Sequence, residues 1–124
     1  MKGLQDSGTR ALSTRQLGIA LDWINNATGR KIDLLYLDAC SMGMAEVADE
    51  IAPYVSYLLA SPNTAWASFA YDDMLADVTA GLSTEQIGRA WLEAEKAALD
   101  ANEQDDVFPY PYTLALYRLD QMDE

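Results

Sequence analysis

The sequence predicts an α/β fold with a largely parallel sheet flanked by helices. Short apolar runs of strand length alternate along the chain with segments whose apolar residues recur at helical spacing. The most apolar run, at 32–37, shows little strict alternation, which is typical of a parallel strand buried on both faces. The chain has 124 residues, half of them hydrophobic, which is enough for the core of one domain or of part of one.

The first predicted helix spans residues 14–28. Ser13 and Gln16 form a capping-box pattern at its start, and apolar residues then follow at helical spacing. Gly29 suits the left-handed conformation that closes many helices, so the helix is expected to end there. Residues 1–12 are mostly polar and contain glycine, and we interpret them as a flexible lead-in.

Two strands with a helix between them are expected next. The run 32–37 is the first strand, and a helix with one apolar face covers about 44–52, where Pro53 stops it. A second apolar run predicts a strand at 55–60. The segment 61–70 is rich in turn residues and is predicted to be a loop.

The rest of the chain predicts two helices, a linker and a strand. A short helix is expected at 72–80. A second helix begins after Ser83, which forms a capping-box pattern with the glutamine three residues later, and runs to about Asp100. Residues 101–106 indicate an acidic linker, and 112–119 indicate a third strand.

Composition excludes several classes of function. Eight basic residues against 20 acidic ones give a net charge of −12, so nucleic acid would be repelled and basic peptides attracted. No apolar stretch reaches the roughly 18 residues that span a bilayer, and the N-terminal residues show no apolar signal core. The chain has no histidine and one cysteine, Cys40, which excludes a self-contained Cys–His catalyst and an internal disulfide.

Cys40 lies where α/β proteins commonly bind ligands. It follows the first predicted strand and precedes a helix, whose backbone N–H groups favour a thiolate. Asp38, two residues earlier, is expected on the same face and can hold a guanidinium or ammonium group through a charge-assisted hydrogen bond. The alternatives are that Cys40 is a small buried hydrophobe and that Asp38 caps the following helix or a loop.

Residues 34–61 read LLYLDACSMGMAEVADEIAPYVSYLLAS, which places Asp-Ala-Cys after an apolar strand, then a glycine turn, a Glu-Val-Ala helix and a strand ending in Ala-Ser. This pattern resembles the nucleophile segment of the clostripain-like cysteine peptidases, and weaker similarity extends over about residues 12–120. The resemblance implies a caspase-like fold. Residues 13–124 would form the C-terminal portion of such a peptidase domain, so the sheet would be incomplete in this chain.

The resemblance implies a cysteine endopeptidase that cleaves after Arg or Lys. Cys40 matches the catalytic nucleophile, and Asp38 matches the acidic residue at the bottom of the first specificity pocket. Ser61, Thr64 and Trp66 fall where the family builds the wall of that pocket. The Thr64 hydroxyl could contact a bound cation, and the Trp66 ring could close over a substrate side chain. The loop that carries them departs from the family's usual acidic, Gly-rich version.

The family's catalytic base is a histidine that lies upstream of the cysteine, and this chain has none. We therefore expect a histidine from outside this chain, on an N-terminal portion separated by autoprocessing or by truncation. The alternatives are a different cysteine hydrolase or acyltransferase, and an inactive pseudo-peptidase that binds basic peptides or a partner. Expected partners are peptides or proteins with basic residues, together with the His-bearing portion or a second copy of this chain.

The expected peptidase chemistry requires no cofactor. Asp72 and Asp73 could bind calcium, which some relatives use, or could instead carry charge at the N-terminus of a helix. Relatives are often exported, but nothing in these residues specifies a location.

Overall fold

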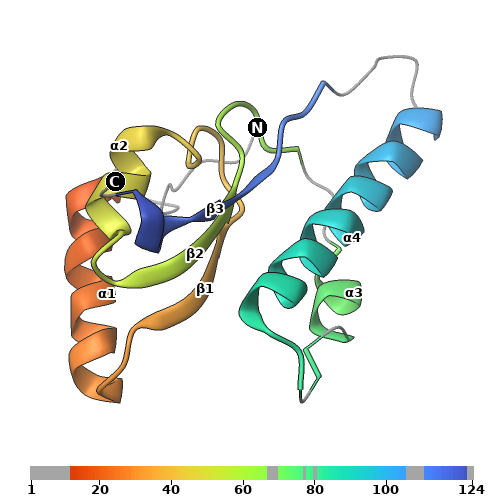
Figure 1. Ribbon diagram of the computed structural model, residues 1–124. Coiled ribbons are helices and arrows are strands. Elements are labelled where there is room, and N and C mark those ends of the chain that lie inside the picture. Colours follow the sequence, from red (N-terminus) through yellow and green to blue (C-terminus); the bar gives the residue numbers. More distant parts are fainter. Residues whose placement is uncertain (1–11, 67–69, 77, 80, 106–110, 123–124) are drawn as a thin grey trace.

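The computed structural model describes residues 12–66, 70–76, 78–79, 81–105 and 111–122 (Figure 1). The expected lead-in, residues 1–12, lies outside this part of the chain except for Leu12. The helices and strands follow in the order α1 (Thr14–Thr28), β1 (Ile32–Leu37), α2 (Ala45–Ile51), β2 (Val55–Ala60), α3 (Tyr71–Ala76), α4 (Thr84–Asp105), β3 (Ala115–Arg118) and a short 3-10 helix (Leu119–Gln121).

The described strands form one mixed sheet in the order β1-β2-β3. β1 runs parallel to β2, with Leu35 opposite Leu58, and β3 runs antiparallel to β2, with Leu116 opposite Leu59. The predicted α/β class is confirmed, and the parallel pair is the β1-α2-β2 unit that the sequence indicated.

Helices cover both faces of the sheet (Figure 1). α1 and α2 pack on one face, and α4 packs on the other with α3 beside it. The core between the sheet and the α1–α2 layer is formed by buried aliphatic side chains from five elements: Leu17, Leu21, Leu37, Val47, Ala48, Ile51, Val55, Leu58, Ala60 and Leu119. Burial of this apolar surface is the main force that holds β1 and β2 in place below the site.

The ends of α1 are fixed by local interactions that the sequence indicated. The Ser13 side chain accepts a hydrogen bond from the Gln16 backbone N–H, and the Gln16 side chain accepts one from the Ser13 backbone N–H. Gly29 adopts φ 70°, and its N–H donates to the Asn25 carbonyl. This left-handed conformation is readily available to glycine and ends the helix before β1.

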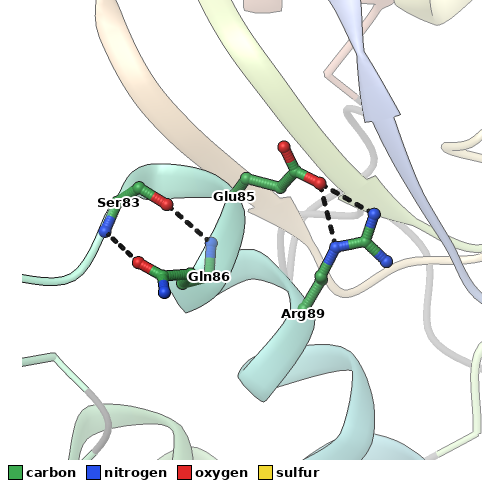
Figure 2. Close-up of polar contacts among 4 residues, drawn as sticks. All are labelled: Ser83, Glu85, Gln86 and Arg89. Carbon is green, nitrogen blue, oxygen red and sulfur yellow. Dashed lines mark hydrogen bonds and ion pairs between the residues drawn. The ribbon is translucent and has the colours of Figure 1, made fainter.

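The N-terminus of α4 is closed in the same way (Figure 2). The Gln86 backbone N–H donates to the Ser83 hydroxyl at 3.2 Å, and the Ser83 N–H donates to the Gln86 side chain at 2.8 Å. Arg89 pairs with Glu85 one turn away at 2.7 Å, an exposed ion pair that contributes little to stability. The capping box therefore fixes where α4 begins.

Two predicted helix boundaries were wrong. Residues 78–79 are not helical, so α3 ends at Ala76 and is shorter than predicted. α4 continues through Asp105, so most of the predicted acidic linker is helix. Residues 89–105 contain neither glycine nor proline, and their alanine, glutamate and glutamine favour helix.

β3 is also shorter than the predicted strand at 112–119. Ala115 lies opposite Ala60, the last residue of β2, so residues 112–114 extend past the end of the neighbouring strand. Leu119 begins the 3-10 helix instead of continuing the strand. The residues before β3 therefore have no β2 residue opposite them, and they form a wall at the edge of the sheet.

Candidate active site

The turn after β1 is bound to the loop after β2 by two backbone hydrogen bonds. The Ser41 N–H donates to the Asn63 carbonyl at 2.7 Å, and the Gly43 N–H donates to the Ser61 carbonyl at 2.9 Å. Ser41 has φ 61°, a left-handed conformation that is uncommon for residues other than glycine. Because such a conformation persists only where the surroundings impose it, the turn around Cys40 has a defined shape.

Gly43 lets this turn approach the loop closely. A Cβ atom at position 43 would lie 2.8 Å from the Pro62 nitrogen, 3.0 Å from the Ser61 carbonyl carbon and 2.9 Å from the Tyr117 hydroxyl. Two of these contacts are with backbone atoms, which cannot move aside easily. A side chain at position 43 would therefore push apart the two segments that form the site.

Cys40 is partly exposed at this edge of the sheet. Its Sγ atom accepts a hydrogen bond from the Ala65 backbone N–H at 3.3 Å and lies 3.8 Å from the Ala65 carbonyl oxygen. The contact fixes the direction of the sulfur. The alternative of a small, fully buried hydrophobe does not describe this position.

A narrow pocket adjoins the Cys40 turn, and the four residues predicted to bind substrate all line it: Asp38, Ser61, Thr64 and Trp66. α4 and the segment before β3 supply other walls. Cys40 is not among the lining residues, but Ala65, which contacts its sulfur, is. The cavity volume is about 10 Å³, which is room for about one water molecule.

The predicted wall residues are held by hydrogen bonds within the loop and across to the segment before β3. The Ser61 hydroxyl is buried, accepts from the Asn63 N–H at 3.1 Å and donates to the Thr64 carbonyl at 3.2 Å. The indole N–H of Trp66 donates to the Pro111 carbonyl at 3.0 Å. Ser61 therefore shapes the loop through its hydroxyl, and Trp66 joins the two sides of the pocket.

Asp38 is partly buried at the mouth of β1, and its carboxylate accepts a hydrogen bond from the Tyr71 hydroxyl of α3. This hydrogen bond raises the pKa of Tyr71 to about 12, because it favours the protonated phenol, and burial adds to the shift. Asp38 therefore contacts α3 through Tyr71.

Among the described residues, no group of three or more His, Cys, Asp or Glu side chains is placed to hold a metal ion. Asp72 and Asp73, the predicted calcium ligands, are exposed in the first turn of α3. None of the helices in this part of the chain is both long and apolar enough to cross a membrane.

Residues 4–124 match the sequence model of the Clostripain family. The chain belongs to the clostripain family. A search of curated proteins found no match. In this clostripain-family chain, Cys40 lies three residues after the end of β1, beside a pocket that contains the Asp38 carboxylate.

Solved structures show that this clostripain-family chain has the fold of cysteine proteases. A cysteine protease of B. fragilis superposes with a TM-score of 0.66 at 19% identity, covering 94% of this chain and 47% of that one. A clostripain from Bacteroides thetaiotaomicron, in complex with the peptide inhibitor BTN-VLTK-AOMK, gives 0.67 at 17% identity, covering 99% and 49%. The predicted caspase-like fold is confirmed, and the chain spans about half the length of these proteins.

Two pocket residues of this clostripain-family chain were not predicted. Glu95 of α4 lines the pocket although only 3% of its surface is exposed, and Tyr36 of β1 lies beside it. Burial raises the pKa of Tyr36, and the negative charges of Glu95 and Asp38 raise it further. The Tyr36 hydroxyl also hydrogen-bonds to Glu95. A signal for Glu95 was present in the sequence, because it stands four residues after Trp91 and four before Leu99, on the face of α4 where apolar residues are expected.

Proposed function

We propose that this chain forms part of a cysteine endopeptidase that cleaves peptide bonds after Arg or Lys. The observation that supports the proposal most directly is the position of Cys40. Its sulfur is held at the carboxyl end of β1 beside a pocket that contains the Asp38 carboxylate. Family membership supports the reaction class, and the carboxylate supports a cationic substrate side chain.

In the proposed reaction, the Cys40 sulfur attacks the carbonyl carbon of the substrate after its proton passes to a histidine. A carbon–sulfur bond forms, and the Cys40 backbone N–H helps to stabilise the oxyanion. The histidine then returns the proton to the amine as the carbon–nitrogen bond breaks. Water hydrolyses the thioester that remains. The histidine comes from outside this chain, which contains none.

Asp38 is proposed to hold the guanidinium or ammonium group of the substrate side chain, and the Trp66 ring to cover its aliphatic part. Both residues line the same pocket. The pocket is smaller than an arginine side chain, so substrate binding requires its walls to separate. The B. thetaiotaomicron clostripain was solved with an inhibitor whose peptide portion, VLTK, ends in Lys. By analogy, this supports a basic residue at the cleavage site.

The proposed His-bearing portion has a suitable docking surface along β1. In the described part of the chain, β1 pairs only with β2, which leaves its other edge open. A cavity of about 510 Å³ follows this edge, and its apolar walls come from α1, β1, the segment before α4 and α4 itself. Exposed Ile24, Val78 and Leu82 are among the lining residues. An open strand edge beside an apolar surface favours the addition of a further strand.

The proposal can be tested by labelling Cys40 with a peptidyl chloromethyl ketone that ends in Arg or Lys. The chain by itself and the chain together with the His-bearing portion are treated in parallel, with a Leu-ended reagent as the control. We expect labelling of Cys40 by the basic reagents in the mixture, and little by the Leu reagent. If Cys40 is labelled in neither sample, the result contradicts the peptidase assignment. Tight binding of the basic peptide without labelling would indicate the pseudo-peptidase alternative.

A further inference from the structure

The carboxylates of Asp38 and Glu95 both line the pocket beside Cys40. The two residues are far apart in the sequence, with 56 residues between them. Asp38 comes from the end of β1, and Glu95 comes from the face of α4 that packs on the sheet. Tyr36 of β1 lines the same pocket, and the negative charges of both carboxylates raise the pKa of its hydroxyl. The pocket therefore has two acidic groups on opposite elements.

A glutamate is an uncommon residue at a position as buried as 95. The side chain is 97% buried, since only 3% of the residue surface is exposed, and a buried carboxylate loses much of its hydration. The hydrogen bond with Tyr36 offsets part of this cost. A well-packed apolar residue at such a position is often neutral or stabilising in comparison. Because Glu95 lines the same pocket as Asp38, its carboxylate is placed to act on a cation bound there.

The part of α4 that carries Glu95 is held in place by a contact with the segment before β3. The Tyr112 hydroxyl, from the segment before β3, donates to the Asp100 carboxylate of α4 at 2.6 Å. Leu99, one turn after Glu95, is buried and lines the same pocket. These contacts hold the middle of α4 against the pocket that Glu95 lines.

We propose that Glu95 is a second specificity-determining carboxylate of this pocket and that, together with Asp38, it makes the site prefer Arg to Lys. The inference rests on the proposed peptidase function. A guanidinium group is planar and presents five N–H donors along its edges, so two carboxylates can bind it at once. An ammonium group is a compact charge with three donors and gains less from a second carboxylate.

The test compares kcat/KM of the full-length protein on matched peptides that end in Arg, Lys or citrulline before the cleaved bond. Citrulline has nearly the shape of arginine without its charge. We expect Glu95→Gln to lower kcat/KM for the Arg peptide about tenfold or more, because a charge-assisted hydrogen bond is lost. The Lys peptide should lose less and the citrulline peptide almost nothing. Glu93→Gln, at an exposed position on the same helix, is the matched control and should change none of the three.

Each other result counts against the proposal. Equal losses on Arg and citrulline peptides would show a structural role for Glu95, and an unchanged Arg-to-Lys ratio would show no role in selection. Glu95→Asp keeps the charge but withdraws it by one methylene, so its Arg-to-Lys ratio should lie between those of Glu95→Gln and the wild type. If Glu95→Gln does not fold, a wild-type ratio in Glu95→Asp overturns the proposal. If the wild-type protein does not prefer Arg and Lys to citrulline, the proposed function itself fails, and this inference fails with it.

Discussion

The hydroxyl of Tyr71 donates a hydrogen bond to Oδ2 of Asp38, which joins α3 to the turn after β1. The contact places a phenol at the carboxylate that is proposed to hold the substrate cation. It also gives that carboxylate a defined orientation before any substrate arrives. A cation that binds Asp38 therefore meets a side chain that is already positioned.

The raised pKa of Tyr71 provides a direct test of this contact. Replacing Asp38 by Asn removes the negative charge that favours the protonated phenol, so the pKa of Tyr71 should fall from about 12 toward the ordinary value of about 10. The measurement is an NMR titration of tyrosine labelled at Cζ, with Tyr71→Phe to assign the resonance. Asp33→Asn, which changes an exposed carboxylate on β1, is the control. An unchanged Tyr71 titration in Asp38→Asn would contradict the contact.

Asp38 should also control the affinity for basic substrates. Asp38→Ala removes the proposed partner of the substrate cation, and we expect kcat/KM for an Arg peptide to fall about 100-fold, the scale of a lost hydrogen bond to a charged group. The melting temperature should change little, because the side chain is only partly buried. Asp49→Ala, at an exposed position on α2, is the matched control. Unchanged affinity for basic peptides in Asp38→Ala would remove Asp38 from this role.

Local signals were sufficient to predict most of the fold. The capping boxes at Ser13 and Ser83 and the left-handed Gly29 predicted the start of α1, the start of α4 and the end of α1. The strands β1 and β2 were predicted because both are short apolar runs between turn residues. The error at β3 occurred where the pairing partner decides the boundary, whereas the helix residues that extend α4 were visible in the sequence. β3 begins at Ala115 because β2 ends at Ala60, which no local pattern reveals.

The predicted site was less complete than the predicted fold. Asp38, Ser61, Thr64 and Trp66 were predicted from the resemblance, and the structure brings all four to one pocket. Glu95 was overlooked because its place in the pocket depends on how α4 packs on the sheet, a contact between distant parts of the chain. A helix pattern shows which face is apolar, but it does not show which strand end that face will meet.

Gly43 should be sensitive to substitution, and Gly88 should be tolerant. An alanine at position 43 would press on the backbone of residues 61–62, so we expect Gly43→Ala to cost about 1–3 kcal/mol and to slow alkylation of Cys40 by iodoacetamide. At position 88 the new Cβ would meet only the ends of the Leu116 side chain, which can rotate, and alanine favours helix by about 1 kcal/mol over glycine. Gly88→Ala is therefore the matched control. Denaturant unfolding measures both variants, and equal destabilisation would contradict this assignment.

The cap at the start of α4 should affect the first turn of the helix and leave the pocket intact. Ser83→Ala removes the hydroxyl that accepts the Gln86 N–H, and we expect a loss of about 1 kcal/mol in the free energy of unfolding (Figure 2). Hydrogen exchange should report it as faster exchange of the Gln86 amide, since that donor loses its partner. Thr79→Ala, at an exposed position before α4, is the control.

Glu95 lies about three turns further along α4, so the Arg-to-Lys ratio of kcat/KM in Ser83→Ala should stay at the wild-type value. A changed ratio in Ser83→Ala would mean that the position of Glu95 depends on the helix terminus, and not on the packing of Leu99 and the Tyr112–Asp100 contact.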